Sequence, residues 1–134
     1  MERLFKRRTE YRFIISPLTL VEIESAFAIK MRMNKLDQAG REAAQDRLRA
    51  DVRELRILVS PQFENIHFEF ARTCVAMHGP QAGIRSLDAL QLSMAIHLSN
   101  SGLLHFLVAA DRALCRVAET YHLAAIDPQS PEAF

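Results

Sequence analysis

Three acidic residues, Glu22, Asp88 and Asp111, stand at positions where carboxylates could carry out chemistry. Glu22 is in line with apolar residues at helical spacing instead of lying on a charged face. Asp88 and Asp111 enclose 22 residues that carry no formal charge. Two carboxylates about 5 Å apart repel by roughly 3 kcal/mol at an effective dielectric constant of 20. A cluster of these acids would therefore retain protons or bind a cation.

The cation that best fits such a cluster is Mg²⁺ or Mn²⁺, because hard divalent ions prefer oxygen ligands. Ions of this kind make water a better nucleophile and offset charge on a phosphoryl group. If the fold brings the three acids together, the sequence predicts metal-dependent hydrolysis of phosphodiester bonds.

Each acid also has an ordinary structural explanation. Thr19 and Glu22 match a helix capping box, whereas Ser16, which a proline follows, is a competing helix start. Asp88 would interact favourably with the dipole of a helix that begins beside it, and Asp111 would cap the next helix. Spacing alone leaves the structural and the catalytic explanations open.

Strands and helices alternate along the sequence. Short apolar runs predict strands over 12–16, 56–60, 105–110 and 124–126, and helical spacing predicts helices over 18–33, 36–55, 63–77, 87–98 and 112–121. This alternation predicts a single α/β domain over 1–134 with a parallel sheet covered on both faces. Because ligands gather at the carboxyl ends of parallel strands, Glu22 and Asp111 should project at the same edge.

Composition narrows the class of protein. Hydrophobic residues make up 49% and charged residues 25% of the 134 positions, which excludes a disordered or fibrous chain. The net charge is only +1, but bases outnumber acids thirteen to nine in residues 1–56 and acids outnumber bases seven to four thereafter. The basic helices within 18–55 either face solvent or form a weak track for an RNA backbone.

Two isolated cysteines and five histidines give neither a disulfide framework nor the spacing of a zinc site. Cys74 continues an apolar helical stripe, so we expect it in the core. The uncharged run 89–110 is interrupted by polar residues and is too polar to span a bilayer. No signal-peptide core follows Met1. The sequence therefore predicts a cytoplasmic protein without a membrane segment.

Four segments together resemble PIN domains, in particular toxin nucleases of the VapC type. Residues 15–22 (ISPLTLVE) are similar to the second segment of that family, and 83–95 (GIRSLDALQLSMA) to the third. Residues 107–114 (LVAADRAL) are similar to the fourth, and 124–128 (AAIDP) to its closing strand. The resemblance implies a three-layer α/β/α fold.

The same resemblance implies a Mg²⁺- or Mn²⁺-dependent endoribonuclease, the toxin of a type II toxin–antitoxin pair. The acids Glu22, Asp88 and Asp111 match the family's metal-binding and catalytic residues. Metal-activated water would then attack phosphorus in line with the leaving oxygen.

Contacts with RNA phosphates would come from Arg85, Arg112 and Ser16. The implied partners are an antitoxin protein, an RNA substrate and a second copy of the chain, and the helices within 18–55 offer apolar surface for a partner. Two alternatives stay open: a catalytically inactive module that binds antitoxin or RNA, and an RNA-processing PIN nuclease without an antitoxin.

One departure from the family concerns the first strand. PIN domains begin with a central strand that ends in an aspartate, whereas residues 1–10 here are typical of the end of a helix and no aspartate precedes Asp37. A late start, a degenerate gene or completion by a partner chain would explain this. We favour truncation, because a parallel sheet without its central strand leaves backbone groups unpaired.

Overall fold

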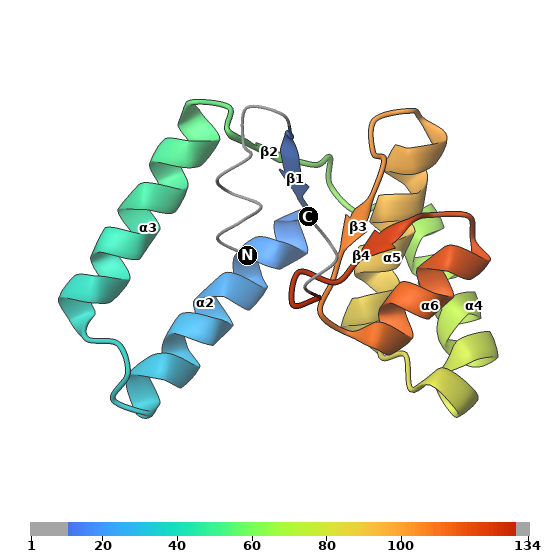
Figure 1. The fold of residues 1–134 in the computed structure, drawn as a ribbon, viewed down its shortest axis with the longest axis horizontal. Coiled ribbons are helices and arrows are strands. Elements are labelled where there is room, and N and C mark those ends of the chain that lie inside the picture. Colours follow the sequence, from blue (N-terminus) through green and yellow to red (C-terminus); the bar gives the residue numbers. More distant parts are fainter. Residues whose placement is uncertain (1–10, 131–134) are drawn as a thin grey trace. The chain divides into compact units, whose positions relative to one another are not determined.

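The computed structural model describes residues 11–130, which contain short strands and longer helices (Figure 1). The elements in chain order are β1 (Phe13–Ile15), α2 (Pro17–Arg32), α3 (Gln38–Arg53), β2 (Ile57–Val59), α4 (Asn65–Ala82), α5 (Ser86–Asn100), β3 (Leu107–Val108), α6 (Arg112–Thr120) and β4 (Ala125–Ile126). All the strands and helices expected between residues 12 and 126 are confirmed. The helical end expected within residues 1–10 lies outside the described residues.

The chain divides into two compact units, and each is described by itself. The described part of the N-terminal unit is residues 11–62, and that of the C-terminal unit is residues 63–130. One domain over 1–134 stays a prediction. Within the described residues, no helix is long and apolar enough to cross a membrane.

Both strand pairs are parallel, as predicted. In the N-terminal unit, β1 pairs with β2 in the register Phe13↔Ile57, and in the C-terminal unit β3 pairs with β4 in the register Leu107↔Ala125. Within residues 11–130 the strands form two two-stranded parallel sheets, β1 with β2 and β3 with β4. A three-layer fold around a single parallel sheet stays a prediction. The protein is thus a mixed α/β structure.

Helix α2 begins at Ser16, whose side chain accepts a hydrogen bond from the Thr19 backbone amide at 3.3 Å. Pro17 occupies the first helical position, where its missing N–H costs nothing and its fixed φ suits the helix. Ser16 as the cap is therefore confirmed, and the alternative capping box between Thr19 and Glu22 is wrong.

Helices α2 and α3 contain no buried residue. Large apolar side chains on α2 are exposed, among them Val21 (64%) and Ile29 (44%). Polar contacts join the two helices instead. The Glu24 carboxylate accepts hydrogen bonds from Arg41 at 2.9 Å and from Gln45 at 2.7 Å.

These two bonds lower the pKa of Glu24, with Gln45 making the larger contribution and Arg41 the next. Because the pKa is lowered in the folded state, the stability that Glu24 contributes is present above its unfolded pKa. That stability is lost as pH falls through the folded value. We expect Gln45→Ala to move the Glu24 titration to higher pH, as measured by NMR of its side-chain carboxyl. An unchanged titration would show that Gln45 does not hold the carboxylate.

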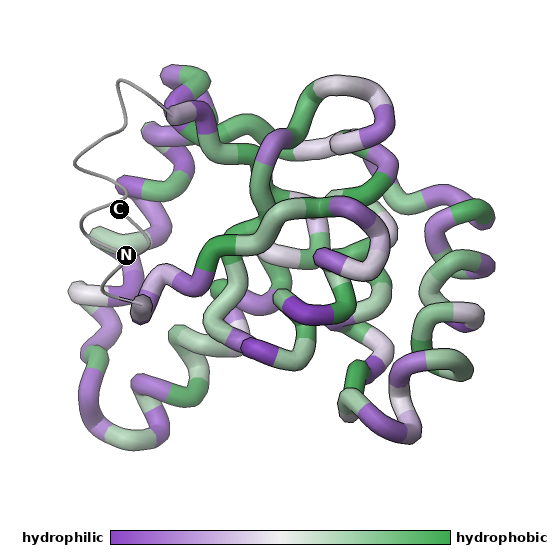
Figure 2. Tube along the Cα trace, turned by 45° about the vertical axis from the view of Figure 1, so that its right-hand side comes forward, coloured by the Kyte–Doolittle hydropathy of each residue, from purple (hydrophilic) through white to green (hydrophobic). Residues whose placement is uncertain are grey.

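The core of the C-terminal unit lies among α4, α5 and α6, where Cys74, Leu92 and Leu123 are fully buried or nearly so. Cys74 is in the core, as the sequence predicted. Figure 2 shows hydrophobic and hydrophilic residues interspersed along the trace. Each of the three helices contributes side chains to this core, among them Ala71 of α4, Ala95 of α5 and Val117 of α6.

The sequence predicts a helix over 63–77, but α4 extends further and ends at Ala82. Pro80 supplies no backbone N–H and so weakens the last turn without ending it. The helix ends at Gly83, which has φ = +71° in the left-handed region that favours glycine.

Two glycines at this end of α4 allow a matched test. A Cβ at Gly83 meets nothing within 4 Å, so Gly83→Ala changes only the backbone preference. We expect it to lower the free energy of unfolding by about 1 kcal/mol. Gly79 is helical, and a Cβ there meets Ile84 and Val75 at 3.4 Å, so Gly79→Ala should be neutral or stabilising. Amide hydrogen exchange along α4 measures the difference, and equal losses of protection in both variants would contradict this explanation.

Candidate functional site

The three acids predicted to bind metal lie in different parts of the structure. Glu22 belongs to α2 in the N-terminal unit, whereas Asp88 and Asp111 belong to the C-terminal unit. A helix that begins at Thr19 would place Glu22 in its first turn. Since α2 begins at Pro17, Glu22 lies in the second turn, where it is exposed. That all three acids share one ion stays a prediction.

Asp88 is the third residue of α5. Its Oδ2 atom accepts a hydrogen bond from the Arg85 backbone amide at 3.3 Å, and the Arg85 Nε atom lies 4.0 Å from the same oxygen. Asp88 therefore has the structural role at the helix start that the sequence indicated. Its Oδ1 atom accepts no hydrogen bond from any residue that the structure describes. One carboxylate oxygen thus stays available to a ligand.

Asp111 precedes the first residue of α6 and caps the helix. Its Oδ1 atom accepts hydrogen bonds from the backbone amides of Ala113 at 2.8 Å and Leu114 at 3.1 Å. This confirms the capping role, and it uses only one of the two oxygens. Over residues 11–130, nothing donates a hydrogen bond to Oδ2.

The helices that begin at these two acids pack against one core. Ala89 directly follows Asp88, Leu114 lies three residues after Asp111, and both Ala89 and Leu114 belong to the buried cluster of the C-terminal unit. Each acid also stands at a helix N-terminus, where the helix dipole favours negative charge. The C-terminal unit therefore holds two carboxylates at the starts of neighbouring helices.

A further carboxylate, Asp127, follows β4 as Asp111 follows β3. Burial raises the pKa of the Cys115 thiol, and the negative charges of Asp127, Glu119 and Asp111 raise it further. Asp127 and Asp111 thus act on the same thiol. Asp127 lies in segment 124–128, which resembles the closing strand, and it was not among the predicted site residues. Its approach to Cys115 follows from the pairing of β3 with β4, which joins residues far apart in the sequence.

The three residues expected to contact RNA phosphates differ in exposure. The Arg85 side chain is 86% exposed, and Arg112 is an exposed residue at the start of α6. Ser16 is only 5% exposed, and its hydroxyl oxygen caps α2. The two arginines are therefore open to an anionic ligand, whereas Ser16 has a structural role.

Within residues 11–130, no three histidine, cysteine, aspartate or glutamate side chains gather closely enough to hold an ion. Asp88 and Asp111 each keep one carboxylate oxygen without a hydrogen-bond donor from these residues, and carboxylate oxygen is the ligand type that a hard divalent ion prefers. Comparison with protein-family models, with curated proteins and with solved structures finds no match.

Proposed function

We propose that the protein is a Mg²⁺- or Mn²⁺-dependent endoribonuclease that acts as the toxin of a toxin–antitoxin pair. The observation that carries the proposal is the pair of acids Asp88 and Asp111. They stand at the starts of α5 and α6, against one core, and each has one oxygen without a hydrogen bond from the described residues. The segments that resemble PIN domains contribute both acids and also contain Glu22.

In this proposal Asp88, Asp111 and Glu22 hold the ion, as part of a three-layer PIN-like domain. The ion would supply Lewis-acid activation of water and would offset charge on the phosphate. Arg85 and Arg112, which are exposed at the starts of α5 and α6, would donate charge-assisted hydrogen bonds to phosphate oxygens. An antitoxin, the RNA substrate and a second copy of the chain are the partners of the proposed toxin.

Metal binding is the direct test of the site. Calorimetric titration of the full chain with Mn²⁺ should show binding that weakens in Glu22→Gln, in Asp88→Asn and in Asp111→Asn. Asp46→Asn is the matched control, since Asp46 is exposed on α3 and pairs with Arg49. If the wild-type chain takes up no Mn²⁺, the metal site is refuted.

A second candidate is a catalytically inactive module that binds a partner protein. Helices α2 and α3 favour it, because they contain no buried residue and α2 exposes apolar residues such as Val21 and Ile29. Surface of this kind is typical of protein contacts. A chain that binds no Mn²⁺ and still forms a stable complex with an antitoxin would support this candidate. An RNA-processing nuclease shares the metal site and would bind no antitoxin.

A further inference from the structure

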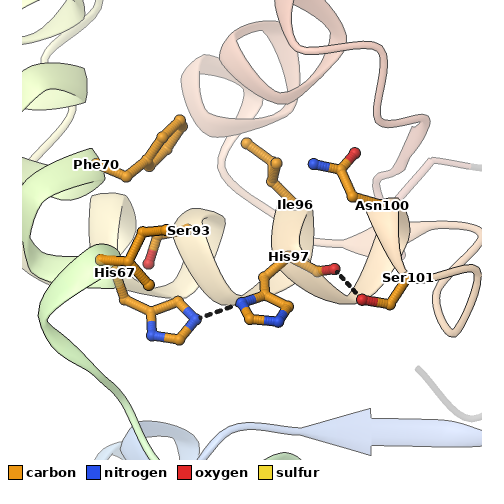
Figure 3. Close-up of a pocket in the computed structure, with 8 residues that line it drawn as sticks. His67, Phe70, Ser93, Ile96, His97, Asn100 and Ser101 are labelled. Carbon is orange, nitrogen blue, oxygen red and sulfur yellow. Dashed lines mark hydrogen bonds between the residues drawn. The ribbon is translucent and has the colours of Figure 1, made fainter.

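The C-terminal unit contains a pocket of about 330 Å³ between α4 and α5 (Figure 3). This volume is at the lower end of the range for small-molecule sites. None of the residues that line the pocket is an aspartate, glutamate, lysine or arginine. An anionic or cationic ligand would therefore find no opposite charge in its walls.

A chain of directed hydrogen bonds ends at this pocket. The Glu64 backbone amide donates to His67 Nδ1 at 2.9 Å, so the neutral His67 ring carries its proton on Nε2. That Nε2–H donates to His97 Nδ1, also at 2.9 Å. The neutral His97 ring therefore carries its own proton on Nε2. A backbone amide thus sets the direction of both bonds and leaves His97 with an N–H donor at the pocket.

Burial holds the first ring of this pair in place. His67 is only 3% exposed, whereas His97 is exposed, and the two ring centroids lie 4.9 Å apart with planes 24° from parallel. The same bond direction argues against a metal ion between the rings. An ion on His67 Nε2 would move the ring proton to Nδ1, where it would face the Glu64 amide.

The rest of the pocket lining combines apolar and polar groups. In Figure 3, Phe70, Ile96 and Asn100 are drawn above the two histidine rings, and Ile96, His97 and Asn100 follow one another at helical spacing along one face of α5. The Asn100 amide, which can both donate and accept, forms no hydrogen bond with any part of the chain that the structure describes. Ser93 donates its hydroxyl proton to the Leu90 carbonyl at 2.7 Å, so towards the pocket it can only accept.

We propose that this pocket binds one nucleobase. A base is planar and uncharged, its faces suit the walls formed by Phe70 and Ile96, and its edges carry the donors and acceptors that His97 and Asn100 require. A purely apolar ligand would leave both of those polar groups without partners when it excludes water. The assignment of the base to single-stranded RNA rests on the proposed function, whereas binding of a nucleobase as such does not.

The test is titration of the full-length, isotope-labelled chain with adenosine, guanosine, cytidine and uridine, without metal, followed by backbone amide NMR. At least one nucleoside should shift amides of residues 66–70 and 93–101 and leave α2 and α3 unchanged. A single-stranded RNA pentamer should shift the same amides, and an RNA duplex should not, because its bases are paired and stacked. Shifts with the nucleoside alone would identify a free nucleoside as the ligand.

Variants at the two polar groups make the test specific. We expect His97→Leu and Asn100→Leu each to weaken nucleoside binding about fivefold to tenfold, as the loss of one hydrogen bond implies. His97→Gln should retain most of the affinity, because its amide can accept from His67 and donate to the base. His105→Leu and Ser99→Ala, at residues outside the pocket, are the matched controls and should bind as the wild type does.

Three results would overturn the proposal: no nucleoside shifts the pocket amides, the shifts occur elsewhere, or both leucine variants bind as the wild type does. RNA cleavage without pocket shifts would overturn the pocket and leave the nuclease intact. Pocket shifts from a nucleoside in a chain that cleaves no RNA would support the pocket and count against the nuclease.

Discussion

Asp88→Asn is expected to reduce Mg²⁺-dependent RNA cleavage by about 100-fold or more. In the proposed mechanism Asp88 is a ligand of the ion, and the ion supplies several kcal/mol of transition-state stabilisation. An asparagine has the same size and can still accept from the Arg85 backbone amide, so the fold should persist. The loss of helix-dipole stabilisation should cost at most about 1 kcal/mol.

The measurement is the initial rate of cleavage of single-stranded RNA at saturating Mg²⁺, with circular dichroism to verify folding. Glu69→Gln is the matched control, because Glu69 is an exposed carboxylate on α4 in the same unit. It should cleave as the wild type does. If Asp88→Asn cleaves at the wild-type rate, Asp88 is not a metal ligand and only its helix-start role remains.

Leu92→Ala is expected to give the largest loss of stability, about 2–5 kcal/mol. Leu92 is 0% exposed in the middle of α5, and truncation to alanine removes buried methyl groups and leaves a cavity among α4, α5 and α6. Its control is Leu87→Ala on the same helix, since Leu87 is 48% exposed and should lose about 0.5 kcal/mol or less.

Amide hydrogen exchange along α5 measures this effect in the C-terminal unit itself. That choice avoids assigning one free energy of unfolding to a chain with two compact units. Similar losses of protection in Leu92→Ala and Leu87→Ala would contradict the position of Leu92 in the core.

Local hydrogen bonds made the helix starts predictable. Ser16 before a proline, and Asp111 before α6, each bond to a backbone amide within three residues, so the sequence contains both partners. The end of α4 was not predictable in the same way. Gly79 and Pro80 are typical of a turn, yet the helix continues to Ala82 because tertiary packing overrides local preference.

Contacts between residues far apart in the sequence could not be predicted from the sequence pattern. His67 and His97 are 30 positions apart, and neither has a spacing that indicates a pair. Asp127 comes near Cys115 through the pairing of β3 with β4. The acids Asp88 and Asp111 were singled out because they enclose a run of residues without charge, which the sequence itself displays. Whether an acid at such a position binds metal depends on groups far away in the sequence.

The parallel pairing of the strands has a consequence for the order of folding. Phe13 and Ile57 must meet across 44 positions of chain, whereas Leu107 and Ala125 are separated by only 18. Closing the longer loop costs about 0.8 kcal/mol more in chain entropy. Because short-range contacts form faster, β3 and β4 should pair before β1 and β2 do. During synthesis β1 leaves the ribosome before β2. It therefore cannot pair until α2, α3 and β2 have also been made.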